Sequence, residues 1–290
     1  MSFFKHRASA RQKPEPDPFA PVAPHDLVAA PGPLLMMMEA RAPWEYAAMV
    51  AAAPWLNRLP VGDGHPVVVF PGLGAADMST VPLRNFLRDR GYTPYAWKQG
   101  FNFGPRHGVL DACRDLVRHT AQRHKEKVSL VGWSLGGVFA LYGAHRAPEC
   151  VRSVVTLGSP VTVDAEGSAS PPFVKAMYRL IAHPMGPAAH TMQPRAKKLR
   201  ERTNLPMPLS CLYSMSDGVV PPQEATVDGD PALHENIRVP GSHIGLGFNA
   251  VVLWIVAERL AQPLGKWRPF EPSGALGYVY RLMTREAAAA

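Results

Sequence analysis

The feature that most restricts the fold of this chain is an alternation of short apolar runs with helical stretches, which begins at residue 66. The run 67–70 reads Val-Val-Val-Phe, a continuous apolar segment expected of a strand that is buried on both faces of a sheet. Further strands are predicted at 93–97, 128–131, 151–157, 209–213 and 236–239, and helices at 81–90, 109–124, 135–145 and 246–260. This alternation predicts an α/β fold, in which a mostly parallel sheet carries helices on both faces.

The remaining stretches lack this alternation. Residues 1–33 are rich in Pro, Ala and charged residues, so we expect a flexible tail. Residues 34–60 are predicted to form a helical segment packed on the core, with a partner- or lipid-facing stripe at their Met-rich start as the alternative. Residues 161–208 are predicted to form a small lid or cap, inserted into a core made of 61–160 and 209–265. Residues 266–290 are expected to form a C-terminal tail.

Composition restricts the class of partner. Hydrophobic residues make up 47% of the 290 residues and charged residues 19%, a balance typical of globular chains and not of disordered ones. The formal net charge is +8, but the densest basic cluster, at 195–202, has no interleaved aromatic residues. We interpret this cluster as a solvated helix face, with an anion- or lipid-attracting patch as the alternative, and we expect no nucleic-acid partner.

Cysteine usage and hydropathy bear on the compartment. The three cysteines, Cys113, Cys150 and Cys211, are widely spaced, so the sequence predicts neither a disulfide framework nor a metal site. The basic N-terminus is not followed by the apolar core of a signal peptide, and the longest apolar stretch, 250–257, is too short to cross a bilayer. We therefore expect a cytoplasmic protein, with peripheral membrane contact as the remaining option.

The sharpest local motif is Gly132-Trp133-Ser134-Leu135-Gly136, which lies between a predicted strand and a predicted helix. A serine hydroxyl becomes a useful nucleophile when it is exposed on a sharp turn, and the glycines remove side chains that would crowd that turn. The backbone N–H of Leu135, at the start of the helix, is predicted to point toward a developing oxyanion. The motif therefore predicts Ser134 as a nucleophile.

A second glycine-containing loop, Phe70-Pro71-Gly72-Leu73-Gly74, directly follows the first apolar strand. Its glycines allow the chain to fold back over the serine, so the N–H of Leu73 is predicted to complete an oxyanion hole. A simple turn that ends the strand is the alternative interpretation.

Two further loops supply a carboxylate and a base. Asp217 follows the strand at 209–213, from which it can reach an imidazole on a neighbouring loop and hold its tautomer. His243 lies in Gly241-Ser242-His243-Ile244-Gly245, a glycine-flanked loop of the kind that a mobile general base needs. The competing candidates are Asp164, Asp228 and Asp230 for the carboxylate and His234 for the base.

The chain order Ser134, Asp217, His243 resembles that of the α/β-hydrolase superfamily, and the resemblance extends from about residue 66 to residue 260. The serine motif and the loop at 70–74 are similar to those of lipase- and esterase-like members. The chain differs from many lipases at Pro71 and Trp133, positions where His is common. The resemblance implies cleavage of carboxylic esters through an acyl-enzyme on Ser134, without a metal or an organic cofactor.

The substrate is less sharply defined by the sequence. Trp133, Phe173, Met177 and Tyr178 are candidates for the wall of an apolar acyl pocket, although a cap packed on the core explains them equally well. We therefore expect a small-molecule or lipid ester with a hydrophobic acyl chain. An acyltransferase or thioesterase with the same triad is the first alternative, and a non-catalytic lipid-binding or interaction module is the second.

Overall fold

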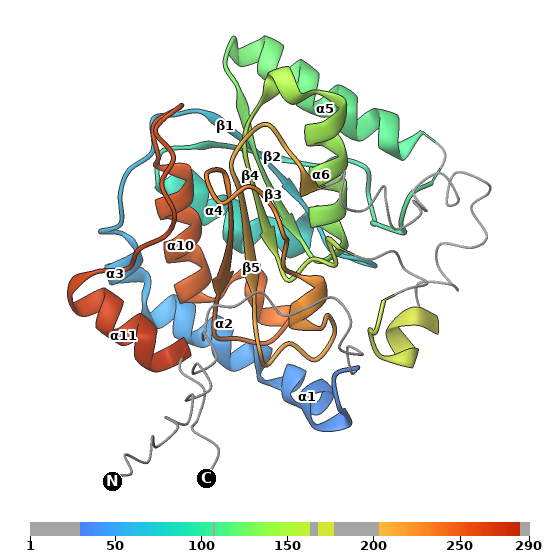
Figure 1. Cartoon of the computed structure of the whole chain (residues 1–290), viewed down its shortest axis with the longest axis vertical. Coiled ribbons are helices and arrows are strands. Elements are labelled where there is room, and N and C mark those ends of the chain that lie inside the picture. Colours follow the sequence, from blue (N-terminus) through green and yellow to red (C-terminus); the bar gives the residue numbers. More distant parts are fainter. Residues whose placement is uncertain (1–29, 107, 163–167, 177–202, 285–290) are drawn as a thin grey trace, which may run out of the picture.

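The computed structural model describes residues 30–106, 108–162, 168–176 and 203–284. Its centre is a six-stranded sheet in the order β2-β1-β3-β4-β5-β6, in which every neighbouring pair is parallel (Figure 1). The strands are β1 (Pro66–Phe70), β2 (Thr93–Ala96), β3 (Val128–Trp133), β4 (Val151–Leu157), β5 (Leu209–Tyr213) and β6 (His234–Arg238). The predicted α/β fold with a parallel central sheet is thus confirmed.

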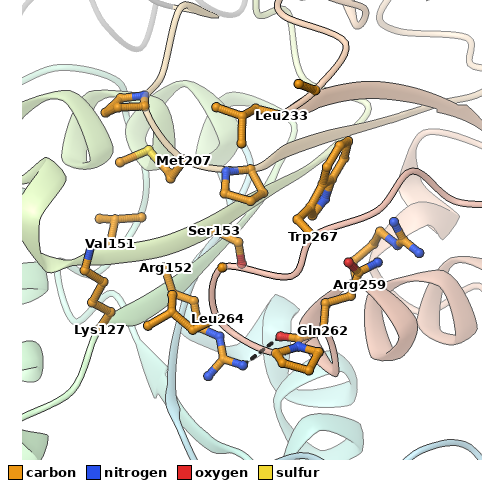
Figure 2. A pocket seen from close by; sticks show the side chains of 15 residues that line it. Lys127, Val151, Arg152, Ser153, Met207, Leu233, Arg259, Gln262, Leu264 and Trp267 are labelled. Carbon is orange, nitrogen blue, oxygen red and sulfur yellow. Dashed lines mark hydrogen bonds between the residues drawn. The ribbon is translucent and has the colours of Figure 1, made fainter.

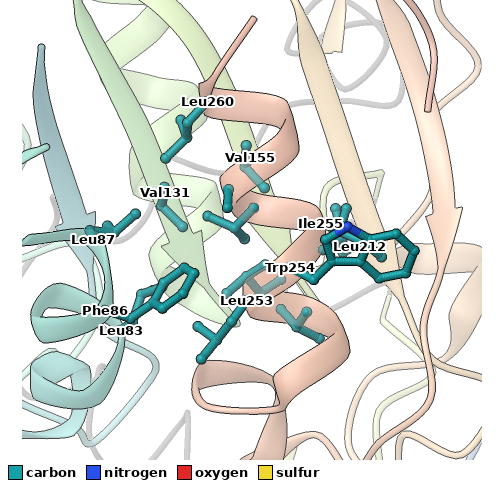
Figure 3. Packing of buried hydrophobic residues seen from close by; sticks show 14 of the residues in the cluster. Leu83, Phe86, Leu87, Val131, Val155, Leu212, Leu253, Trp254, Ile255 and Leu260 are labelled. Carbon is teal, nitrogen blue, oxygen red and sulfur yellow. The ribbon is translucent and has the colours of Figure 1, made fainter. Parts of the chain in front are cut away.

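Helices cover both faces of the sheet because successive side chains of a strand point to opposite faces. Val67 and Val69 of β1 pack with α4 (Val81–Asp89) and α10 (Ala250–Leu260) in one apolar cluster, part of which is drawn in Figure 3. Val68 and Phe70 pack in the second cluster, with α5 (Val109–His124) and α6 (Leu135–Arg146). The continuous apolar run at 67–70 therefore follows from burial on both faces.

The predicted helix boundaries agree closely with the structure except before α10. The sequence predicts a helix from residue 246, whereas residues 244–247 form the short 3-10 turn η6 (Ile244–Gly247) and α10 begins at Ala250. Asn249 explains this boundary, because its side-chain oxygen accepts hydrogen bonds from the N–H groups of Val251 and Val252 and so caps the helix. The shorter helix leaves the residues after His243 in a tight turn.

Both ends of the described chain contribute helices to this core. The N-terminal segment comprises α1 (Pro33–Met38), η1 (Glu39–Arg41), α2 (Ala42–Ala51) and α3 (Ala53–Leu56), and α1 and α2 lie toward the carboxyl ends of the strands (Figure 1). The stretch expected as a C-terminal tail contains α11 (Gly274–Thr284), from which the Tyr280 hydroxyl donates to the carbonyl of Arg238. The Tyr280 ring also packs edge-on against Trp254 of α10.

The remaining short turns are η2 (Asp77–Thr80), η3 (Pro148–Cys150) and η5 (Pro222–Glu224). Of the predicted lid at 161–208, residues 163–167 and 177–202 lie outside the described residues. In the part of the chain that the structure describes, no helix has the length and hydropathy needed to cross a membrane.

Candidate active site

Ser134 stands at the turn between β3 and α6, at the carboxyl end of β3. Its backbone has φ 54° and ψ −127°, a conformation that residues with a side chain rarely adopt. The turn is tight because a Cβ on Gly132 would overlap Gly137, and one on Gly136 would overlap the carbonyl of Phe70. These two glycines allow the strand to turn directly into the helix and leave the Ser134 hydroxyl presented at the turn.

The structure brings the three predicted residues of the triad together. His243 Nε2 lies 2.9 Å from Ser134 Oγ, and His243 Nδ1 lies 2.7 Å from Asp217 Oδ2. Asp217 and His243 are both buried. The other carboxylate oxygen of Asp217 accepts hydrogen bonds from the N–H groups of Val219 and Val220, at 2.8 and 2.7 Å. The carboxylate is therefore fixed in a position from which it orients the imidazole.

The surroundings of His243 favour the imidazolium form. Burial alone would lower the pKa of the imidazole, but the carboxylate of Asp217 and, to a smaller extent, that of Glu39 outweigh it, and the pKa of His243 is raised above its ordinary 6.5. A histidine held in this way can accept a proton from the serine, and the resulting charge is stabilised by Asp217.

Two backbone N–H groups lie where oxyanion donors are expected. Leu135 is the first residue of α6, so its N–H has no partner within the helix. The loop after β1 approaches the serine closely, because a Cβ on Gly72 would lie 3.2 Å from Ser134 Cβ. Leu73 follows Gly72 in this loop, and the described geometry is compatible with the predicted oxyanion hole.

Sequence reasoning missed the residue that anchors this loop, Asn102. Its side chain is fully buried, its Nδ2 donates to the carbonyl of Pro71 at 2.7 Å, and its Oδ1 accepts from Gly104 at 3.1 Å. Its backbone carbonyl also accepts from the N–H of Gly74 at 2.8 Å. Asn102 lies in an aperiodic stretch with no motif, so no signal in the sequence singles it out.

The predicted acyl-pocket residues are not brought together as a group among the described residues. Trp133 Nε1 donates to the carbonyl of His243 at 3.0 Å, so this side chain supports the histidine loop. Phe173 is 66% exposed, and Met177 and Tyr178 lie outside the described residues.

The competing candidates for base and carboxylate lie elsewhere. Both ring nitrogens of His234 bond to backbone groups, Nε2 to the carbonyl of Leu205 and Nδ1 to the N–H of Asp230. Asp228 and Asp230 are exposed, and Asp164 lies outside the described residues. Of the described candidates, Asp217 and His243 are the pair that contacts Ser134 as a hydrogen-bonded chain.

A cavity of about 310 Å³, whose lining side chains are drawn in Figure 2, lies at the other end of the strands from the triad candidates. Lys127 precedes β3, Arg152 and Ser153 stand at the start of β4, and Met207 precedes β5, so the lining belongs to the amino ends of the strands. There Arg152 Nη2 donates a hydrogen bond to the carbonyl of Gln262 at 2.8 Å. None of the three triad candidates lines this cavity. Among the described residues, no cluster of His, Cys, Asp and Glu side chains is arranged to hold a metal ion.

Residues 67–271 match the alpha/beta hydrolase family, and the chain therefore belongs to that family. The resemblance that the sequence motifs indicated is thus confirmed. The mouse (Mus musculus) protein named serine hydrolase BPHL is 30% identical over 118 residues, which cover 37% of this chain and 40% of that protein. The chain therefore matches less than half the length of this relative.

Two solved structures illustrate the shared fold. Aspergillus fumigatus lipase B superposes with a TM-score of 0.54 at 14% identity, over 70% of this chain and 54% of that one. Bacillus licheniformis lipase BlEst2 superposes with a TM-score of 0.52 at 17% identity, over 71% of this chain and 95% of that one. At these identities the likeness concerns the fold.

Proposed function

We propose that this protein is a serine hydrolase that cleaves carboxylic esters through an acyl-enzyme on Ser134. The observation that carries the proposal is the hydrogen-bonded chain from Ser134 Oγ through the His243 imidazole to the Asp217 carboxylate. These three hydrogen-bonded side chains lie at the carboxyl ends of the parallel strands, where ligands of open α/β sheets bind. The strained backbone of Ser134 is a second support, because such strain is concentrated at functional sites.

In the proposed reaction, Ser134 Oγ attacks the ester carbonyl while His243 Nε2 takes the hydroxyl proton. The N–H groups of Leu135 and Leu73 bind the oxyanion, and the Asp217 carboxylate stabilises the imidazolium. When the tetrahedral intermediate collapses, the alcohol leaves with the proton from His243, and the acyl group stays on Ser134. Water then attacks the acyl-enzyme and gives its proton to His243, and the second collapse returns that proton to Ser134 and releases the acid.

The proposed substrates are small-molecule or lipid esters with a hydrophobic acyl chain. Exposed apolar side chains support this assignment, since Ile244 directly follows His243 and Met215 lies in the loop of Asp217. On the N-terminal segment, Leu34, Met37 and Trp44 are at least 70% exposed, which suits contact with an apolar substrate phase at the membrane surface.

The proposal is tested by labelling with a fluorophosphonate probe, which reacts with activated serines. Labelling is expected for the wild-type chain and to be lost in Ser134→Ala and His243→Ala. Ser153→Ala is the matched control. Ser153 lies near the amino end of β4, at the other end of the strands from Ser134, so this substitution should leave labelling unchanged. A folded wild-type chain that is not labelled would contradict the proposal and favour a non-catalytic lipid-binding module.

Substrate class is then resolved with p-nitrophenyl esters of increasing acyl length, acyl thioesters and an added alcohol acceptor. Faster cleavage of the longer esters, with free acid as product, is the expected result. Preference for the thioester, or transfer of the acyl group to the alcohol, would replace ester hydrolysis by thioesterase or acyltransferase activity on the same triad.

A further inference from the structure

A buried carboxylate from the N-terminal segment touches the loops that carry Asp217 and His243. Glu39, in η1, is 8% exposed. Its Oε1 accepts hydrogen bonds from the N–H groups of Gly218 at 2.8 Å and His243 at 2.9 Å, and its Oε2 accepts from Ile244 at 2.9 Å. Buried carboxylates need partners that compensate for lost hydration, and in the described structure these backbone N–H groups provide that compensation.

The two loops follow different strands, and Glu39 joins them. Gly218 directly follows Asp217 in the loop after β5, whereas His243 and Ile244 belong to the loop after β6. The Glu39 side chain therefore fixes the position of the loop that contains Asp217 relative to the loop that contains His243. A shift of one loop relative to the other would disturb the 2.7 Å contact between Asp217 and His243 or the bonds to Glu39.

Neighbouring residues of the segment strengthen this connection. Glu45 Oε1 accepts from the N–H of Ser242 at 2.8 Å and from Arg41 Nε at 3.0 Å. Arg41 in turn donates through Nη2 to the hydroxyl of Ser216 at 2.8 Å and to its carbonyl at 3.1 Å. The residues just before Asp217 and just before His243 are thus also held by the N-terminal segment.

Glycines in both loops make room for the segment. A Cβ on Gly218 would lie 2.5 Å from the carbonyl oxygen of Leu35, and a Cβ on Gly245 would overlap the Glu45 carboxylate. The glycines around His243, which the sequence suggested for mobility of the base, here permit close packing. The loop of the base is therefore held, not free.

We infer that Glu39 is a positioning residue of the proposed triad, which holds the loops of Asp217 and His243 in register and places a negative charge against the backbone N–H of His243. This inference rests on the proposed function. The segment that supplies Glu39 precedes residues 67–271, the part of the chain that matches the family, so it adds an element to the site that the family match does not include.

The electrostatics of His243 agree with this role. Against the effect of burial, Asp217 from the loop after β5 and Glu39 from η1 both raise the pKa of the imidazole. Glu45 and Arg41, which hold the adjacent residues, form an ion pair with each other. Loss of the charge on Glu39 should therefore lower the pKa of His243, with Asp217 still in place.

The decisive variants are Glu39→Gln and Glu39→Asp. The Gln variant removes the charge and replaces one carboxylate oxygen by an NH2 group. This donor would face the N–H of Ile244, or the N–H groups of Gly218 and His243, which are themselves donors. The Asp variant keeps the charge but is one methylene shorter. Glu235→Gln is the matched control, because Glu235 is a largely buried carboxylate bonded to Arg259, Ser210 and the N–H of Phe270 away from the triad.

Two measurements are made on the full chain, after loss of fluorophosphonate labelling in Ser134→Ala has established the nucleophile. The first is the pH profile of kcat/KM for a p-nitrophenyl ester, whose acidic limb reports the pKa of the free base. The second is an NMR titration of the His243 imidazole, which needs no turnover and keeps failure of this inference separate from failure of the proposed function.

For Glu39→Gln we expect both the acidic limb and the imidazole titration to move to lower pH. We also expect the plateau of kcat/KM to fall by about 10- to 100-fold, the effect of misplacing a reacting group by up to about 1 Å. Glu39→Asp should lose rate while its titration stays near that of the wild type, which keeps the test valid if the Gln variant does not fold. Glu235→Gln should leave both measurements unchanged. A folded Glu39→Gln with a wild-type rate and titration would overturn the inference, as would a loss of thermal stability alone.

Discussion

The loop that is proposed to supply the second oxyanion donor depends on one buried side chain, Asn102. The change Asn102→Ala removes the hydrogen bond to the carbonyl of Pro71 and the one from the N–H of Gly104. Pro71 and Gly104 are both buried, so neither the Pro71 carbonyl nor the Gly104 N–H regains a partner from bulk water. The backbone bonds of residue 102 with Gly74 and Ala75 stay in place, so the loop should be loosened at Pro71 without being released.

The magnitude follows from these two bonds. A buried polar group left without its partner costs about 1–3 kcal/mol, so two of them should reduce the free energy of unfolding by roughly 2–6 kcal/mol. Loss of an oxyanion donor lowers kcat by about 10²- to 10³-fold, and a donor that is displaced but not removed should have a smaller effect. We therefore expect kcat of Asn102→Ala to fall by about 10- to 100-fold, since about 1 Å of misplacement costs up to 10²-fold.

The assay combines urea unfolding with kcat measured on a p-nitrophenyl ester at a temperature where the variant is folded. Asn236→Ala is the matched control, because Asn236 also makes two hydrogen bonds to backbone groups, both of Val227. The control should keep the wild-type kcat. If Asn102→Ala loses the expected stability but also keeps the wild-type kcat, the loop at Pro71 does not supply the oxyanion donor and the reasoning is wrong.

Three further predictions concern the turn, the acid response and the core. Gly136→Ala should abolish fluorophosphonate labelling because its Cβ would overlap the carbonyl of Phe70, whereas Gly32→Ala, with open space around it, should keep labelling. Burial lowers the pKa of His65 below its ordinary 6.5, so the unfolded chain binds this proton more readily; the contribution of His65 to stability in urea should be lost as pH drops below about 6.5, and His65→Gln should lose less stability than the wild type over that range. Leu253→Ala, in a fully buried position of α10, should lower the free energy of unfolding by about 2–5 kcal/mol in urea titrations while labelling is unchanged.

The sequence alone determined the features that depend on neighbouring residues. The apolar run at 67–70 predicts a doubly buried strand because its composition requires burial on both faces, and the spacing of Gly132 and Gly136 around Ser134 predicts a sharp turn because glycine is required there for steric reasons. The start of α10 was less well predicted, because capping by Asn249 outweighs the apolar pattern that begins at residue 246.

The tertiary structure decided the features that depend on segments far apart in the chain. Glu39 lies 204 residues from His243, and Asn102 lies 31 residues from Pro71, so no local pattern could indicate that either pair is in contact. Likewise, α11 is held by the contacts of Tyr280 with Trp254 and Arg238, which only the folded sheet brings near. A local pattern can predict which residue types suit a catalytic turn, but the contacts that fix the loops form only when distant segments pack together.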